Sequence, residues 1–446
     1  MSTVVALIDG EHYPPVVRTA LSALGAEFDV VTAAFVGGTE KVDGRAVDAY
    51  GVPVVHGTDA EDALRKAIAR YRPAAIVDLS DEPVLTASDR FRLASIALGE
   101  GIEYRGADFR FTPPRPRLRL RTPTLAIIGT GKRVGKTGIS AHVARRLASQ
   151  GRDIVVVAMG RGGPAEPELI HGDRVRLTTE DLLALAAQGK HAASDNYEDA
   201  VMSRVTTVGC RRCGGGMAGD TFFSNVPEGA RLADGLGKEL VILEGSGAAI
   251  PPVSADATLL VVGAGQGVGY LRDYFGPFRL ARADGVVITG AEEPVASRAQ
   301  IEALLAAVRE LRPGIPVAVT TFRPRPISTV EGARVFFATT APASLLPLLS
   351  AHLEDEHSCT VVGASAHLSD RVRLRADMAD AAGTFDLLVT ELKAAAIDVV
   401  AATGAEAGVP TVLCDNVPVP VLGGDMDAVL DAVASRAFRQ GREGSA

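Results

Sequence analysis

The sequence predicts an α/β protein, with an N-terminal Rossmann-like parallel-sheet domain followed by a larger α/β domain. Apolar runs of strand length alternate with helix-like stretches along most of the 446 residues, which is the rhythm of parallel sheets covered by helices. Aromatic residues make up only 5% of the chain and Trp is absent, which disfavours an all-β fold. A chain of this length predicts two or three domains.

The first domain is predicted to span residues 1–111. Its expected strands are 3–8, 30–36 and 74–79, and its expected helices are 16–25 and 60–71. Ligands bind at the carboxyl ends of the strands in such sheets. There the chain places polar residues in three loops: Asp9, Glu11, His12 and Tyr13, then Thr39, Glu40 and Lys41, then Asp78, Ser80, Asp81 and Glu82. Arg90 and Arg92 are expected on a solvated helix face.

Residues 112–123 interrupt this rhythm and are predicted to be a domain linker. Four prolines in this segment can neither continue a helix nor donate to a sheet. The larger domain is predicted to span 124–446. Its expected strands are 125–128, 154–158, 240–243, 258–262, 285–289, 315–320, 334–338, 359–362, 387–389 and 411–414.

The strongest motif is residues 129–137, Gly-Thr-Gly-Lys-Arg-Val-Gly-Lys-Thr, between an expected strand and an expected helix at 139–148. This is the context of a P-loop, whose backbone N–H groups bind phosphate. The motif predicts a P-loop NTPase domain that binds ATP and Mg²⁺. Lys136 is expected to reach the β- and γ-phosphates, and Thr137 to bind the metal. The expected nucleotide-binding residues are Gly129, Thr130, Gly131, Lys132, Arg133, Val134, Gly135, Lys136 and Thr137.

The loop departs from the common P-loop pattern, because Thr130 stands where the first glycine is usual and the glycine is one residue earlier. This spacing resembles dethiobiotin synthetase and its relatives. Residues 240–247, Leu-Val-Ile-Leu-Glu-Gly-Ser-Gly, also resemble that class's apolar strand ending in Glu-Gly-Ala-Gly. The resemblance implies a P-loop domain of the dethiobiotin synthetase-like class, with Glu244 holding Mg²⁺ directly or through water. The alternative for Glu244 is a helix cap or a surface carboxylate.

Enzymes of that class phosphorylate an acid, so cations are expected beside the P-loop. Arg161 stands at the tip of a glycine-rich turn after strand 154–158, and Lys132 lies inside the P-loop. Arginine can bind phosphate with two hydrogen bonds and keeps its charge. We therefore expect Lys132, Lys136, Arg161 and Glu244 to be catalytic. A plain surface turn is the alternative for Arg161.

Residues 210–219 read Cys-Arg-Arg-Cys-Gly-Gly-Gly-Met-Ala-Gly. A single Cys-x-x-Cys could begin a zinc site or form a redox pair, but no second pair follows at metal spacing. A flexible glycine-rich loop near the site is favoured, with Arg211 or Arg212 contacting an anion. An ordinary mobile loop is the remaining alternative.

These segments together resemble the cyclic 2,3-diphosphoglycerate synthetase family. The resemblance includes residues 8–15 (Ile-Asp-Gly-Glu-His-Tyr-Pro-Pro), residues 35–41, the P-loop, residues 160–163 and the Cys-x-x-Cys segment. It implies an ATP-dependent ligase that converts 2,3-diphosphoglycerate to the cyclic diphosphate, releasing ADP and phosphate. It also implies that His12, Lys41, Arg161, Arg211 and Arg212 bind the substrate. For His12 the alternative is a cap on the following helix.

Two other functions are weighed. Residues 332–342 and 388–393 resemble segments of tetraacyldisaccharide 4′-kinase, which keeps a small-molecule kinase acting on a phosphorylated acid as the alternative. A nucleotide switch is disfavoured, because such proteins usually carry a signature lysine where this chain has Gly131.

Composition limits the remaining partners and the location. A net charge of −8 disfavours nucleic-acid binding, which needs a basic surface. No signal-peptide pattern opens the chain and no apolar run is long enough to span a bilayer, so no membrane partner is expected. With four cysteines, a reduced cytoplasmic protein is predicted. A homodimer is expected, because relatives with this loop often pair.

Overall fold

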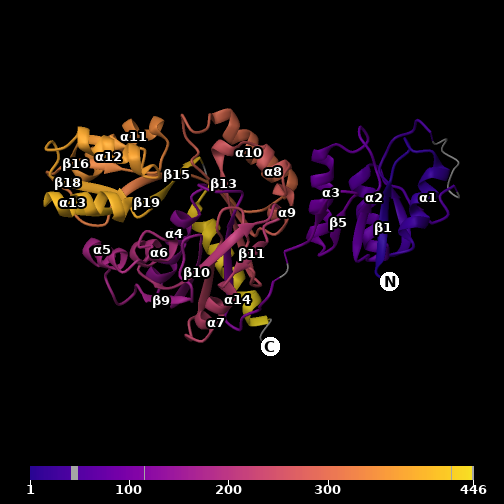
Figure 1. Cartoon of the computed structure of the whole chain (residues 1–446), viewed down its shortest axis with the longest axis horizontal. Helices are drawn as coiled ribbons and strands as arrows, with labels where there is room; N and C mark the ends of the chain where they lie inside the picture. Colours follow the sequence, from indigo (N-terminus) through magenta and orange to yellow (C-terminus); the bar gives the residue numbers. More distant parts are fainter. Residues whose placement is uncertain (42–48, 115, 423, 444–446) are drawn as a thin grey trace. The chain divides into compact units, whose positions relative to one another are not determined.

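The computed structural model describes residues 1–41, 49–114, 116–422 and 424–443. The chain divides into two compact units (Figure 1). The N-terminal unit comprises Met1–Arg115, Val268–Arg282 and Glu310–Arg312, and the larger unit comprises Pro116–Gly267, Ala283–Arg309 and Pro313–Ala446. Two short segments from the second half of the chain therefore belong to the N-terminal unit. The described part of residues 112–123 contains no helix or strand.

The N-terminal unit is built on a six-stranded sheet in the order β3-β2-β1-β4-β5-β6. Every pairing is parallel except that of β5 with β6. Its elements are β1 (Thr3–Ile8), α1 (Pro14–Leu24), β2 (Asp29–Phe35), β3 (Val54–Val55), α2 (Ala60–Tyr71), β4 (Ala75–Asp78), α3 (Ala87–Gly99), β5 (Glu103–Arg105), β6 (Arg110–Phe111), α8 (Gly269–Arg272) and α9 (Gly276–Ala281). β1 pairs with β2 on one side and with β4 on the other, so the direction in which successive strands are added to the sheet reverses at β1. The loops that follow β1, β2 and β4 therefore meet at one edge of the sheet.

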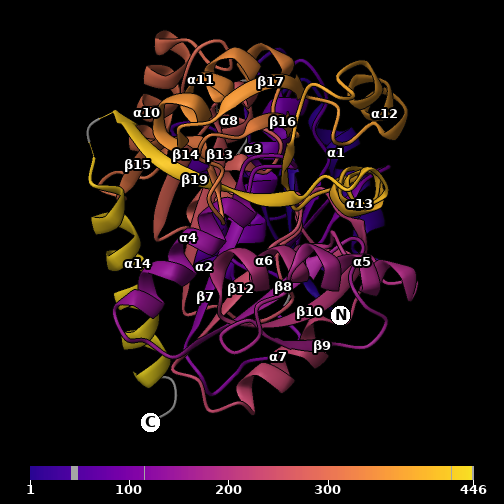
Figure 2. The ribbon, with the colours of Figure 1, turned by 90° about the vertical axis from the view of Figure 1, so that its left-hand side faces the viewer.

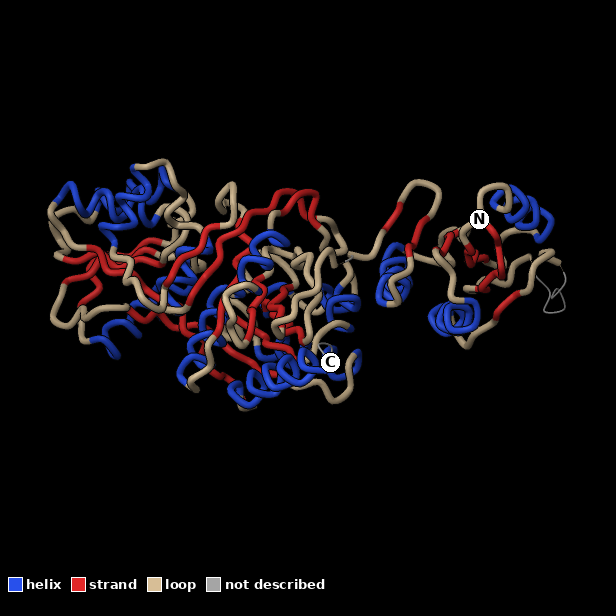
Figure 3. The backbone as a smooth tube through the Cα atoms, turned by 90° about the horizontal axis from the view of Figure 1, so that it is seen from below, coloured by secondary structure: helices blue, strands red, loops and turns tan. Residues whose placement is uncertain are grey.

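The larger unit contains a sheet of thirteen strands among the described residues, in the order β11-β10-β8-β12-β7-β13-β14-β15-β19-β18-β16-β17, with β9 beside β10. The pairings from β10 to β15 are parallel, and so are those from β19 to β17, but β15 and β19 run antiparallel. In Figure 3 the strands of both units are red and their helices blue. The structure confirms the predicted α/β class with parallel sheets.

The strands of the larger unit are β7 (Thr124–Gly129), β8 (Ile154–Gly160), β9 (Glu168–His171), β10 (Thr206–Gly215), β11 (Thr221–Ser224), β12 (Leu240–Glu244), β13 (Ala257–Gly263), β14 (Gly285–Thr289), β15 (Val317–Pro326), β16 (Arg334–Ala338), β17 (Thr360–Ser365), β18 (Leu387–Glu391) and β19 (Thr411–Leu422). Its longer helices are α4 (Lys136–Ser149), α5 (Thr179–Ala187), α6 (Asp195–Ser203), α7 (Val226–Asp234), α10 (Arg298–Leu311), α11 (Leu346–His357), α12 (Arg371–Asp380), α13 (Ala402–Ala407) and α14 (Met426–Glu443).

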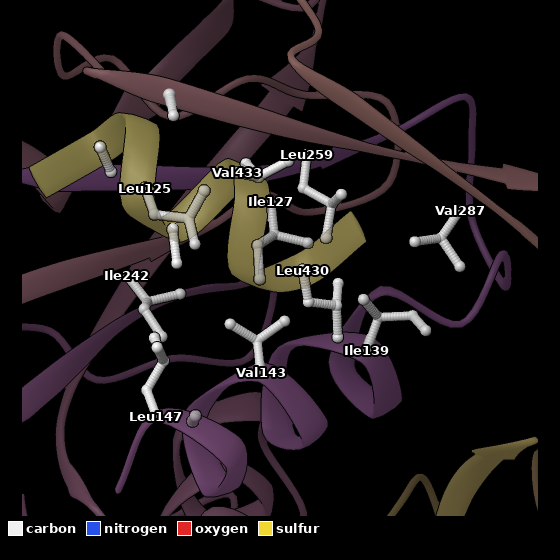
Figure 4. Close-up of a cluster of buried hydrophobic side chains, with 14 of the residues drawn as sticks. Leu125, Ile127, Ile139, Val143, Leu147, Ile242, Leu259, Val287, Leu430 and Val433 are labelled. Atoms are coloured by element: carbon white, nitrogen blue, oxygen red, sulfur yellow. The ribbon is translucent and has the colours of Figure 1, made fainter. Parts of the chain in front are cut away.

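The main core of the larger unit lies under α4 and α14, which cover the same face of the sheet (Figure 4). Leu125 and Ile127 of β7 pack against Val143 of α4 and Leu430 of α14. The Arg146 guanidinium on α4 also pairs with the Asp431 carboxylate on α14 at 2.6 Å. This packing anchors the helix that follows the P-loop. Among the described residues, no helix is both long and apolar enough to cross a membrane.

Candidate active site

The predicted P-loop connects the end of β7 at Gly129 to the start of α4 at Lys136. Gly135 has a φ of +81°, which favours glycine, and a Cβ there would lie 2.4 Å from the Phe322 ring. At Gly129 a Cβ would lie 2.9 Å from Cδ of Lys136. The Lys136 side chain therefore folds back over Gly129. That contact gives a physical reason for glycine at this position, one residue earlier than in the common pattern.

The loop brings Lys136 and Thr137 beside the end of β12. The buried Lys136 Nζ donates to the Gly131 carbonyl at 2.8 Å. Burial lowers the Lys136 pKa to about 8, although the nearby Glu244 carboxylate opposes this shift. The Thr137 hydroxyl donates to Glu244 Oε1 at 2.8 Å. The two predicted metal ligands are thus in direct contact.

Lys132 lies in the P-loop and Arg161 in the turn after β8, and both residues are exposed. Within the described ranges, neither side chain makes a hydrogen bond or ion pair. The Arg161 charge, followed by desolvation and the Arg133 charge, lowers the Lys132 pKa. Two neighbouring cations without counter-ions form a site that an anion would stabilise.

Arg211 and Arg212 lie in β10, so the interpretation of residues 210–219 as a flexible loop was wrong for residues 210–215. β10 pairs with β8, β9 and β11. Neighbouring side chains on a strand point in opposite directions, and the two arginines separate accordingly. Arg212 Nη2 donates to the Ser246 carbonyl at 2.8 Å, beside Glu244, whereas Arg211 Nε donates to the Pro164 carbonyl at 2.6 Å. Only Arg212 therefore reaches the loop that follows β12.

The cysteines of the Cys-x-x-Cys segment differ in their surroundings. Cys210 is buried and its pKa is raised to about 12, chiefly by burial, while Cys213 is exposed. Over the part of the chain that the structure describes, no group of three or more His, Cys, Asp or Glu side chains is arranged to hold a metal ion. A raised thiol pKa also does not favour redox chemistry.

A cavity of about 680 Å³ opens beside the turn that carries Arg161. Its lining residues come from the segment after β8, from β9, from the loop between α5 and α6, from the start of α6 and from β10, and they include Glu168, Lys190, His191, Asn196, Tyr197 and Arg211. Glu168 already accepts from the Tyr197 hydroxyl at 3.0 Å and pairs with the Lys190 ammonium group. The volume suits a small ligand.

His12 and Lys41 belong to the N-terminal unit, where the loops after β1 and β2 meet. His12 Nδ1 lies 2.8 Å from Asp9 Oδ1, and His12 Nε2 lies 3.2 Å from Asp81 Oδ2. Lys41 Nζ lies 3.4 Å from Glu40 Oε1. Both candidate side chains are therefore already next to carboxylates.

Arg90 corrects another expectation, since its helix position suggested a solvated side chain. Its Nε donates to the buried Asp78 Oδ2 at 3.0 Å. Asp78 Oδ2 also accepts from the Tyr104 hydroxyl at 2.8 Å. Arg90 thus neutralises a carboxylate in the core of the N-terminal unit.

The chain matches the N-terminal domain of cyclic 2,3-diphosphoglycerate synthetase over residues 3–112, its P-loop domain over 124–321 and its C-terminal domain over 326–417. The chain belongs to the cyclic 2,3-diphosphoglycerate synthetase family.

Relatives named cyclic 2,3-diphosphoglycerate synthetase match along nearly the whole length. The protein from Rubrobacter xylanophilus is 49% identical over 440 residues, covering 98% of each chain. That from Methanothermus fervidus is 46% identical over 442 residues, covering 96% of each chain. That from Thermococcus kodakarensis is 48% identical over 425 residues, covering 95% of this chain and 96% of the relative. The predicted family is confirmed.

The acidic helix α6 was not among the site elements predicted from the sequence. It lies next to α4 and β8 (Figure 2). Asp195, Glu198 and Asp199 come from this helix, and Glu198 Oε1 lies 3.0 Å from Lys393 Nζ. Burial raises the Glu198 pKa to about 8. The i, i+3 and i+4 spacing of the three acids, which places them on one helix face, was the available signal.

Proposed function

We propose that this protein is an ATP-dependent ligase that closes 2,3-diphosphoglycerate into cyclic 2,3-diphosphoglycerate, releasing ADP and phosphate. Family membership over nearly the whole chain supports the reaction. The observation that carries the proposal is the pair Lys132 and Arg161, two cations that are available for phosphate beside a P-loop lysine.

In this proposal the P-loop binds the triphosphate of ATP. The backbone N–H groups of residues 129–137 and the N-terminus of α4 face the phosphates. Lys136 Nζ would exchange its contact with the Gly131 carbonyl for the β- and γ-phosphates. The loop is held in place for this because Val134 is buried in the core and its carbonyl accepts from the Thr289 hydroxyl at 2.7 Å.

The chain's own donors also fit Mg²⁺. Thr137 offers a hydroxyl and Glu244 a carboxylate whose Oε2 is buried without a hydrogen-bond donor, and Mg²⁺ typically takes one or two carboxylates together with phosphate oxygens. A bound Mg²⁺ would supply positive charge against the phosphates. The protein would hold it through Thr137 and Glu244.

Ring closure would follow in two steps. An oxygen of one substrate phosphate attacks the γ-phosphorus of ATP, the bond from that phosphorus to the β-phosphate oxygen breaks, and ADP leaves. An oxygen of the other substrate phosphate then attacks the substrate phosphorus that carries the transferred group. The bond from that phosphorus to the oxygen bridging to the transferred group breaks, inorganic phosphate leaves and the ring closes. Both steps bring like charges together, so positioned cations are the main requirement. Lys132, Lys136 and Arg161 would meet it.

We place the substrate's remaining phosphate and carboxylate groups on Arg161, Arg211 and Arg212, with His12 and Lys41 as candidates in the N-terminal unit. The support differs among them. Arg212 adjoins the loop after Glu244 and Arg211 lines the cavity. His12 and Lys41 already contact the carboxylates of Asp9 and Glu40. These contacts would have to break before either side chain could bind the substrate.

The proposal also includes a homodimer in the cytoplasm. All four cysteines are free, as a reducing compartment would require. The dimer rests on the resemblance of the P-loop to enzymes that pair. Sedimentation equilibrium on the purified chain tests it.

Phosphorus NMR tests the reaction. The protein is mixed with ATP, Mg²⁺ and 2,3-diphosphoglycerate. Coupled phosphoanhydride signals that appear with equal amounts of ADP and phosphate would support the ligase. A stable, non-cyclic phosphorylated product with ADP but without free phosphate would favour the kinase instead.

A further inference from the structure

Asp199 is a buried carboxylate that the proposed chemistry has not yet used. It lies on α6, is fully buried, and its carboxyl group is within hydrogen-bonding reach of the Glu244 carboxyl. Both Asp199 oxygens and Glu244 Oε2 are buried without a hydrogen-bond partner among the described residues, which is costly in a protein interior.

The other acids of α6 have different surroundings. Glu198 is matched by the Lys393 ammonium group at 3.0 Å. Asp195 is only half-buried, so water can solvate it. Asp199 alone among the three has no cation contact and no access to water in the described structure.

The neighbours of Asp199 indicate which kind of ligand its unpartnered oxygens could bind. Its neighbour Glu244 accepts from the Thr137 hydroxyl at 2.8 Å, and Thr137 directly follows the P-loop lysine. Two carboxylates that face one another beside a hydroxyl offer oxygen donors to a hard divalent cation. We infer that Asp199 completes the Mg²⁺ site with Thr137 and Glu244, either touching the ion or holding one of its water ligands.

This inference rests on the proposed binding of Mg²⁺ with ATP, and it adds a second carboxylate. It also gives α6 a role. The helix carries one acid for the metal and a second, Glu198, that holds Lys393 near the P-loop. The segment between β9 and β10, which contains α5 and α6, would thus form one wall of the nucleotide site.

The test measures Mn²⁺ binding by electron paramagnetic resonance, in the presence of a non-hydrolysable ATP analogue and without 2,3-diphosphoglycerate. For Asp199→Asn we expect affinity about 10- to 100-fold weaker than in the unchanged protein. The matched control is Glu180→Gln, an exposed acid on α5, and it should leave the affinity unchanged. Because no acid substrate is present, a failure here is distinct from a failure of the ring-closing reaction.

Thermal unfolding without metal supplies a second readout. The side-chain amide introduced by Asp199→Asn could donate to Glu244, but it offers no negative charge to a cation. The substitution should therefore leave the metal-free Tm close to that of the unchanged protein and lose the Tm increase produced by Mn²⁺ with the analogue. A merely structural role would lower the metal-free Tm and leave the Mn²⁺ affinity unchanged, which would overturn the inference.

A crystal of the unchanged protein with Mn²⁺ and the analogue decides the case if the variant does not fold. Anomalous density in direct or water-mediated contact with Asp199 is the expected result. Density on Thr137 and Glu244 without such a contact would overturn it.

Discussion

The polar edge of the N-terminal unit and the P-loop edge of the larger unit are built from similar residues but treat their charges differently. In the N-terminal unit, Asp9 accepts from the backbone N–H groups of Glu11 and His12, and the His12 ring lies between Asp9 and Asp81. At the P-loop edge, Lys132 and Arg161 have no such partners among the described residues. The polar groups of the N-terminal edge hydrogen-bond with one another, whereas the P-loop edge holds two cations without a described partner.

This difference distinguishes residues that stabilise a loop from residues that are available to bind a ligand. Lys132 and Arg161 are near enough for the Arg161 charge to lower the Lys132 pKa, so a phosphate bound beside both would relieve their repulsion. In the N-terminal unit, a hydrogen bond with the Glu40 carboxyl raises the pKa of Glu11, so acids also face one another there. The P-loop edge is therefore expected to contribute more to binding a polyanion.

The largest effect is expected from Lys136→Ala. Removing the cation that faces the transferred phosphate should lower kcat by about 10²- to 10³-fold, measured as ADP release. Lys66→Ala, which removes an exposed ion pair with Asp62 on α2, is the control and should retain activity. Full activity in Lys136→Ala would contradict the P-loop assignment and with it the comparison.

Arg90→Ala tests the self-satisfied unit. The change leaves the Asp78 carboxylate buried without its cation, so the free energy of unfolding should fall by about 3 kcal/mol, measured by urea denaturation.

Arg92→Ala on the same helix is the matched control, because its ion pairs with Glu61 and Asp89 are more exposed, and the expected loss there is at most about 1 kcal/mol. Equal losses in both variants would mean that Arg90 is no more structural than a surface arginine.

Arg161→Ala tests the unmatched edge from the other side. Loss of a charged hydrogen-bond donor to phosphate should lower kcat/KM by about 10- to 100-fold, while Tm should hardly change because no described protein group depends on the side chain. Arg174→Ala, at another exposed position, serves as the control. A large drop in Tm with unchanged kinetics would place Arg161 among the structural residues.

The smallest effect is expected from Lys41→Ala. Its ammonium group is exposed beside Glu40, so KM for 2,3-diphosphoglycerate should rise by at most about fivefold. His12→Ala provides the comparison within the same edge. A rise in KM that exceeds the loss in Arg161→Ala would reverse the ranking of the two edges and move the main substrate contacts to the N-terminal unit.

Periodicity and local motif spacing predicted much of the fold. Strands such as β1, β7 and β16 were predicted within a residue or two of their ends, because their apolar runs are bounded by polar or glycine-rich segments. The strand β10 was missed because its Arg-Arg-Cys-Gly-Gly end carries no apolar pattern. Its pairing with β8, β9 and β11 overrides that local composition.

The candidate site divides in the same way. Lys136, Thr137 and Glu244 could be predicted because each stands at a set distance from a strand end, and the structure brings them together. Asp199 and Lys393 could not, since they meet this site only through packing between distant segments. Arg90 was misjudged for the same reason, because its partner Asp78 lies on another element.

The sequence by itself determined the α/β class, the P-loop and the family, since all three depend on short-range patterns: apolar periodicity, glycines at a turn, and residue spacing after a strand. Only the tertiary structure decided which charges are paired. The His12 ring contacts two carboxylates, and Arg212 donates to the loop that follows Glu244. The Asp199 oxygens and Glu244 Oε2 are buried without a hydrogen-bond donor among the described residues. Pairing depends on distances between segments far apart in the chain, and those distances exist only once the core has packed.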